Sequence, residues 1–191
     1  MKKIFLYLYP IQEYNRSFEF SEEYLQQNGR ENPYKVLNEC IQKRYRDKGY
    51  QIVYAIYPDK SLYGINLLPT DKIIYTDVTF EQANGYSGDI KYPNESYLIA
   101  QLGDFDEIVV GGFHFGDCVK RVAEYCYQCG TSVLVDLDLT DLFFNIYHKK
   151  DYFKIDEYNP KNYKNVKTFG NELTFIDFEY DFEDYMNFIK D

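Results

Sequence analysis

The topology of this chain follows from residues 107–137, which read EIVVGGFHFGDCVKRVAEYCYQCGTSVLVDL. The apolar runs Glu107–Gly111 and Ser132–Leu137 are typical of strands that are buried on both faces. The residues between them predict a helix over Asp117–Cys129, which Gly130 ends. A strand, a helix and a second strand joined by tight connections form the βαβ unit of a parallel sheet.

Segments on both sides of this unit extend the same architecture. A helix is predicted to start at Asn32 and Pro33 and to end at Gly49, and the polar stretch from about Gln12 to Glu31 predicts a long loop or lid. No internal repeat or linker divides residues 1–191. We therefore expect a single α/β domain, a three-layer α-β-α sandwich with a mainly parallel, Rossmann-like sheet. Further strands are predicted at Ile4–Tyr9, Ile52–Tyr57, Lys72–Val78 and Thr174–Tyr180.

The charge and composition of the chain exclude several kinds of partner. There are 21 Lys and Arg residues against 31 Asp and Glu, which gives a net charge of −10. Because nucleic acids and anionic membranes attract clustered basic residues, we expect neither partner. The apolar run at the amino terminus stops at Pro10 with no small-residue cleavage site after it, which favours a strand over a signal peptide. Four cysteines form no dense disulfide framework, so we expect a cytoplasmic location.

The loop from Gly111 to Val119 carries the candidate nucleophile, Cys118. It lies where the carboxyl ends of parallel strands bind ligands. In the first turn of a helix, free backbone N–H groups favour a thiolate, and the Asp117 and Cys118 amides could receive an oxyanion. The Asp117 carboxylate opposes ionisation of the thiol if it points that way. The alternative is a cysteine that simply packs in the core.

Two motifs in this region give a resemblance to a known family. Gly112 stands six residues before the pair Cys118-Val119, and Lys91 stands 27 residues before Cys118 in the segment IKYPNESY. In these features the stretch from about Asp89 to Val135 resembles the isochorismatase-like cysteine hydrolase superfamily, which includes nicotinamidases and carbamoyl-amidohydrolases. The resemblance implies that Cys118 attacks a C–N bond of a small amide or imide, that Lys91 supports the thiolate, and that no cofactor takes part.

One position departs from the family pattern. The family has an Asp-x-Gln motif after its first strand, where this chain has Pro10, Ile11 and Gln12. The family aspartate acts as general base, which a proline cannot do. Glu13 and His114 are the candidate substitutes. The alternative function is therefore that of a catalytically inactive family member that binds a small molecule or a protein.

The same resemblance predicts the surroundings of the site. Family members that bind a metal use an Asp-x-His pair and a further histidine, an arrangement that His114 and His148 do not form, so we expect no metal. Because relatives are commonly oligomers, we expect a homo-oligomer that acts on a small-molecule ligand. The expected pocket residues are Tyr9, Pro10, Gln12, Tyr92, Phe113, His114 and Phe115.

Two further motifs have competing interpretations. Residues 136–140 match the Asp-x-Asp-x-Thr signature of haloacid dehalogenase phosphotransferases, but only 51 residues follow, with no Asp-Asp pair among them. The alternative is that Asp138 or Thr140 caps a following helix. Cys126 and Cys129 have the spacing of half a zinc site or a redox pair, although core packing is favoured because no second pair exists and the motif ends a helix.

Overall fold

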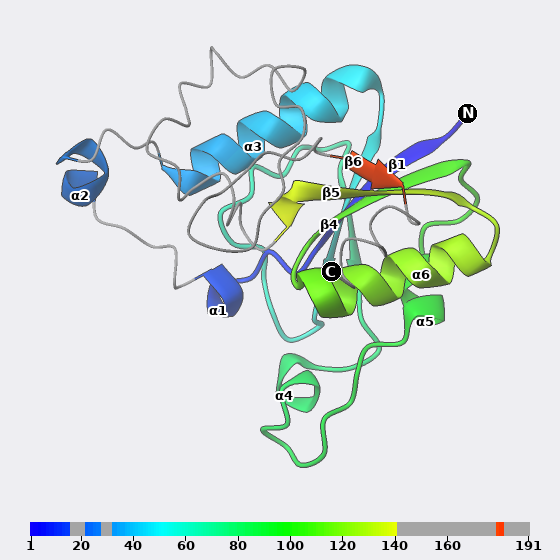
Figure 1. Ribbon diagram of the computed structural model, residues 1–191. Coiled ribbons are helices and arrows are strands. Elements are labelled where there is room, and N and C mark those ends of the chain that lie inside the picture. The colour runs from blue at the N-terminus through cyan, green and yellow to red at the C-terminus, as the bar shows by residue number, and fades with distance from the viewer. Residues whose placement is uncertain (16–21, 28–31, 141–178, 182–191) are drawn as a thin grey trace.

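A single sheet runs through the part of the chain that the computed structural model describes, residues 1–15, 22–27, 32–140 and 179–181 (Figure 1). Its strands are β1 (Lys3–Leu8), β2 (Gln51–Ile56), β3 (Lys72–Tyr75), β4 (Glu107–Gly112), β5 (Ser132–Thr140) and β6 (Glu179–Asp181). The order across the sheet is β3-β2-β1-β4-β5-β6. Neighbouring strands are parallel except for β6, which is antiparallel to β5. The predicted α/β class with a mainly parallel sheet is confirmed.

Helices flank both faces of this sheet (Figure 1). They are α1 (Gln12–Asn15), α2 (Glu22–Gln27), α3 (Pro33–Arg44), α4 (Phe80–Ala83), α5 (Glu95–Ala100) and α6 (Lys120–Gln128), with a short 3-10 helix η2 (Arg46–Lys48) and a π-helical turn η3 (Phe115–Val119). Helix α3 covers one face, and α5 and α6 cover the other (Figure 1). The predicted three-layer arrangement is therefore present.

Most elements lie where the sequence places them, and the differences have local causes. The Asn32 side chain caps α3 by accepting a hydrogen bond from the Tyr34 amide at 2.9 Å. The polar stretch from Gln12 to Glu31 is not only a loop, because its described parts contain α1 and α2. Thr140 ends β5, and the helix expected after it lies outside the described residues, as does most of Thr174–Tyr180.

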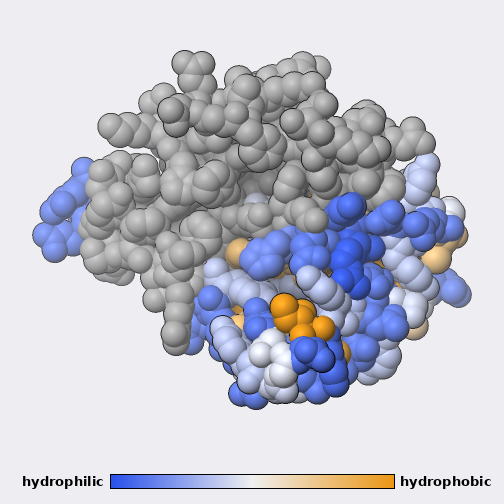
Figure 2. All heavy atoms as spheres, turned by 60° about the horizontal axis from the view of Figure 1, so that its bottom comes forward, coloured by the Kyte–Doolittle hydropathy of each residue, from blue (hydrophilic) through white to orange (hydrophobic). Residues whose placement is uncertain are grey.

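The loop between α4 and α5 places apolar side chains at the surface. Tyr86, Ile90 and Tyr92 are all more than half exposed. Figure 2 turns the α4 end of the molecule toward the viewer and shows a mainly hydrophilic described surface with a small apolar area. Among the described helices, none is long and apolar enough to cross a membrane.

An ion pair inside the core ties α3 to β5. Arg44, the last residue of α3, donates from one terminal nitrogen to both carboxylate oxygens of Asp136 at 3.0 Å. Both side chains are completely buried. The Tyr45 hydroxyl and the Leu139 amide also donate to this carboxylate, at 2.6 and 3.1 Å. An aspartate that attacks phosphate must face a ligand, so the phosphotransferase interpretation does not fit Asp136.

Replacing Asp136 with asparagine is expected to lower the free energy of unfolding by about 3–5 kcal/mol, because Arg44 then keeps a buried charge without its carboxylate. Urea unfolding followed by circular dichroism measures this loss. Glu39→Gln is the matched control, since the Glu39 pair with Lys35 lies at the surface, 3.9 Å apart, and its loss should change stability by less than about 0.5 kcal/mol. An Asp136→Asn variant with the wild-type urea midpoint would contradict this role.

Candidate functional site

A cleft opens beside Cys118 near the point where β1 and β4 end. These two strands are neighbours, but the chain leaves β1 toward α3 on one face and β4 toward α6 on the other. Parallel sheets bind ligands at such a switch point, outside the carboxyl ends of the strands. The cleft has a volume of about 240 Å³ with its open mouth included. It is lined by Tyr9, Tyr92, Pro93, Asn94, Glu95, Leu98, Cys118, Arg121 and Val122.

The backbone after β4 brings Cys118 to this place. Gly112 has a φ of +103°, and a Cβ atom there would lie 2.2 Å from the carbonyl oxygen of Leu8. Only glycine fits this position. The chain then passes through a cis peptide bond between Phe113 and His114 and enters the π-helical turn that contains Cys118. The predicted helix over Asp117–Cys129 is therefore observed, with a π-helical first turn.

The surroundings of the Cys118 thiol keep it protonated. Burial raises its pKa to about 12, with a second contribution from the Asp117 carboxylate, whose Oδ2 atom accepts a hydrogen bond from Sγ at 3.9 Å. A backbone hydrogen bond from His114 and the charge of Arg121 act in the opposite direction. The Asp117 carboxylate thus points toward the Cys118 thiol and opposes its ionisation. The activated thiolate expected from a helix start is therefore not what this environment favours.

The cation in the cleft is Arg121, three residues after Cys118. Its Nε atom donates to the carboxylate of Glu95, and its guanidinium carbon lies 4.4 Å from the centre of the Tyr92 ring. Lys91 precedes these residues on an exposed loop, where its backbone amide donates to the Gln82 carbonyl at 3.0 Å. Lys91 does not line the cleft. Its proposed role beside the thiol stays a prediction.

An aromatic cluster stands behind the cleft, on the segments that surround Pro10. The rings of Tyr9 and Tyr57 are stacked with centres 4.8 Å apart, and Tyr14 meets both edge-on. Tyr14 also lies 5.6 Å from Phe113, between ring centres. Burial raises the pKa of Tyr9, Tyr14 and Tyr57, and ionisation of Cys118 would raise the pKa of each further, as expected for groups that are close in space. Pro10 itself is buried, and its carbonyl accepts the Tyr63 amide at 2.8 Å.

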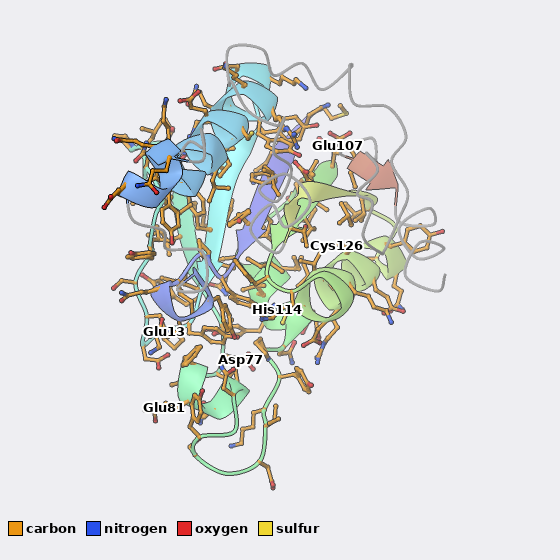
Figure 3. All side chains as sticks on the ribbon, turned by 60° about the vertical axis from the view of Figure 1, so that its left-hand side comes forward. Glu13, Asp77, Glu81, Glu107, His114 and Cys126 are labelled. Atoms are coloured by element: carbon orange, nitrogen blue, oxygen red, sulfur yellow. The ribbon has the colours of Figure 1, made fainter. Side chains whose placement is uncertain are left out.

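The two candidate substitutes for the family aspartate do not line the cleft. Glu13 lies on α1, where its carboxylate forms an ion pair with Lys60 at 2.7 Å. His114 is exposed on the loop after β4, and its ring packs edge-on against Tyr14 with centres 4.9 Å apart. Figure 3 shows Glu13 and His114 near the same end of the sheet.

The hydroxyl of Tyr9 is a polar group without a partner at the cleft. Tyr9 is only 1 % exposed, yet it lines the cleft, and the described residues give its hydroxyl no hydrogen bond. Burial raises its pKa well above the ordinary value, so it is a neutral hydrogen-bond donor. A buried hydroxyl that borders a cavity is available to a ligand or to water.

The sequence and the structure agree on part of the site. Of the expected pocket residues, Tyr9 and Tyr92 line the cleft with Cys118, whereas Pro10, Gln12, Phe113 and His114 do not, and the Phe115 side chain is outside the described ones. The lining residues that the sequence did not predict are Pro93, Asn94, Glu95, Leu98, Arg121 and Val122. The spacing of Cys118 and Arg121 was the available signal, because residues three apart share one helix face. Of the two cysteines with the spacing of half a zinc site, Cys126 is buried in the core, whereas Cys129 is exposed.

Comparison with known proteins gives matches among solved structures alone. No protein-family model and no curated protein matches the chain. The N-carbamoylsarcosine amidase of Thermoplasma acidophilum matches at 16 % identity and a TM-score of 0.45, covering 81 % of this chain and 99 % of the amidase. The nicotinamidase PncA of Bacillus subtilis matches at 14 % identity and a TM-score of 0.37, covering 73 % and 86 %.

A third match is the "putative Mar1 ribonuclease" of Leishmania major, at 14 % identity and a TM-score of 0.47, covering 73 % of this chain. The chain spans less than two thirds of that protein, 64 % of its length. Proteins described as isochorismatase-family members are also among the matched structures. Identities and TM-scores of this size carry no argument about activity, which is therefore argued from the residues of this chain.

The raised pKa of Cys118 predicts how the thiol reacts. Its alkylation by iodoacetamide should rise about tenfold per pH unit between pH 7 and 10 without levelling off, because the thiolate fraction grows until the pH passes about 12. Asp117→Asn removes a like charge, so the pKa falls and the rate at pH 8 rises roughly three- to tenfold. Mass spectrometry of the Cys118 peptide measures both rates. Glu124→Gln, on the same helix, is the control, and labelling that levels off below pH 8 would contradict the raised pKa.

Proposed function

We propose that the chain is a cysteine hydrolase that cleaves a C–N bond of a small amide or imide, with Cys118 as the nucleophile. The observation that supports this proposal is the set of side chains that line the cleft. They include the thiol of Cys118, the carboxylate of Glu95 and the guanidinium of Arg121. A nucleophile, a group that exchanges protons and a fixed positive charge are the parts that acyl transfer requires.

The reaction begins with attack of Cys118 Sγ on the carbonyl carbon of the substrate. The thiol proton leaves as the S–C bond forms, the C–N bond then breaks, and the nitrogen departs with a proton. Water hydrolyses the resulting thioester and restores the thiol. Tyr9 lines the cleft, and its hydroxyl is the donor that we assign to the developing oxyanion. The Asp117 amide already donates to the His114 carbonyl at 3.3 Å, so Cys118 is the remaining backbone candidate for that role.

The dimensions and walls of the cleft limit the substrate. The volume of about 240 Å³ includes solvent outside the mouth of the cleft, so the space beside Cys118 admits only a small group of a substrate. The Tyr92 ring forms one wall, and Leu98 and Val122 provide apolar contacts. These features support a compact substrate with a flat or apolar part next to its amide group.

A second function is supported by a specific observation, the protonated state of Cys118 together with Pro10 in place of a base. In this alternative the chain is a catalytically inactive relative, and the cleft binds a small molecule or contributes to a protein-binding surface. The Tyr9 hydroxyl and Arg121 would then hold the ligand without chemistry.

Replacing Cys118 with serine distinguishes the two functions. Proton NMR of the wild-type protein with a panel of small primary amides and cyclic imides detects hydrolysis directly, and saturation transfer detects binding. We expect product from the wild type and from the control Cys129→Ser, and a loss of at least about 10³-fold in Cys118→Ser. Binding without product in all three proteins would establish the inactive alternative instead.

The cation that supports the reaction is tested by two further variants. Because Arg121 lines the cleft and Lys91 does not, Arg121→Met is expected to reduce hydrolysis more than tenfold, whereas Lys91→Met should change it less than about threefold. Hydrolysis rates measured on one amide from the same panel decide between them. A larger loss in Lys91→Met would restore the role that the family resemblance implies.

A further inference from the structure

A protonated Cys118 thiol requires a group that accepts its proton, and Pro10 cannot be that group. A half-buried thiol beside the Asp117 carboxylate must give up its proton during attack, and the departing nitrogen must receive one. Pro10 has no group that takes part in either transfer. A hydrolase built on Cys118 therefore needs an acid–base group from another element.

Among the described residues, the carboxylate that lines the cleft together with Cys118 belongs to Glu95. Asp117 touches the thiol but does not line the cleft, so it does not face a bound substrate. Glu13 is held in its pair with Lys60, and His114 packs against Tyr14 outside the cleft. This comparison leaves Glu95 as the acidic side chain that lines the cleft together with Cys118.

The position of Glu95 is well defined. It is the first residue of α5, where the Asn94 side chain caps the helix by accepting the Tyr97 amide at 3.1 Å. One carboxylate oxygen, Oε1, accepts a hydrogen bond from Arg121 Nε. The described residues give Oε2 no hydrogen-bond donor. The carboxylate is thus anchored by one oxygen on a residue that lines the cleft.

Arg121 is a positioning residue in this arrangement. It is held between the Glu95 carboxylate and the face of the Tyr92 ring. Charge coupling supports the closeness of these groups, since the charge of Glu95 raises the pKa of both Cys118 and Tyr9, and Arg121 lowers it. The guanidinium therefore fixes the position of the Glu95 carboxylate beside the Tyr92 ring.

We propose that Glu95 is the general base and acid of the Cys118 reaction, an inference that rests on the proposed hydrolase function. The Cys118 proton passes to Glu95 Oε2 as sulfur bonds to the carbonyl carbon. When the C–N bond breaks, Glu95 returns that proton to the leaving nitrogen. Water then adds to the thioester and gives a proton to Glu95, the C–S bond breaks, and the proton returns to sulfur. The products are a carboxylic acid and an amine.

A matched pair of chromogenic probes tests this role in the full chain. p-Nitroacetanilide and p-nitrophenyl acetate transfer the same acetyl group, but nitroaniline needs a proton to depart and nitrophenolate does not. Glu95→Gln should therefore slow the anilide by about 10²–10⁴-fold and the ester by at least tenfold less. This ratio of rates within one variant is not altered by a partial loss of folded protein. Glu95→Asp, which keeps a shorter acid, should recover part of the anilide activity.

The remaining variants separate the possible failures. Asp117→Asn is expected to retain anilide hydrolysis within about tenfold, and Glu124→Gln to match the wild type. An unchanged anilide-to-ester ratio in Glu95→Gln, with Cys118→Ser inactive, would overturn the role of Glu95 and leave the hydrolase function intact. Selective loss of anilide hydrolysis in Asp117→Asn would assign the role to Asp117 instead. Wild-type rates no higher than those of Cys118→Ser would overturn both the function and this inference.

Discussion

The close approach of Gly112 to the backbone of Leu8 is the constraint on which the site depends. These residues are partners in the β1–β4 register, and a side chain at position 112 would collide with the Leu8 carbonyl. The approach allows the chain to turn immediately after β4, beside the end of β1. Tyr9 and Cys118 then face the same cleft although 109 positions separate them in the sequence. If the strands β1 and β4 were farther apart at Gly112, Cys118 and Tyr9 would no longer line the same cleft.

The aromatic cluster behind this junction explains the unusual chemistry of Cys118. Tyrosine and phenylalanine account for 37 of the 191 residues, 22 and 15 respectively. Tyr14, Tyr57 and Phe113 pack with Tyr9 in one cluster and do not line the cleft themselves. They exclude water from one side of Cys118, which disfavours its charged form. The aromatic content therefore acts mainly through burial, and Tyr9 is the member of this cluster that lines the cleft.

The sequence predicts the sheet well because its strands are buried on both faces. Continuous apolar runs such as Ile4–Tyr9 and Ile52–Tyr57 have few other stable placements, and glycines mark the ends of the connecting helices. The candidate site is harder to predict. Cys118 is found from its loop, but Glu95 and Arg121 meet only because α5 packs against α6. Lys91 is the opposite case. The family motif predicts a site residue there, but α5 starts only at Glu95, so Lys91 lies on the exposed loop before the helix.

The electrostatics of the cleft bear on the type of substrate that the proposed hydrolase would take. Arg121 and Glu95 neutralise each other, and Asp117 adds a negative charge next to the sulfur. An anionic substrate would therefore meet repulsion at the reacting centre, in a chain that already carries a net charge of −10. A neutral amide meets no such repulsion, and its carbonyl and N–H groups complement the Tyr9 hydroxyl and the carboxylate of Glu95. In the reaction proposed above, a thiol that stays neutral until attack makes proton transfer part of the bond-making step itself.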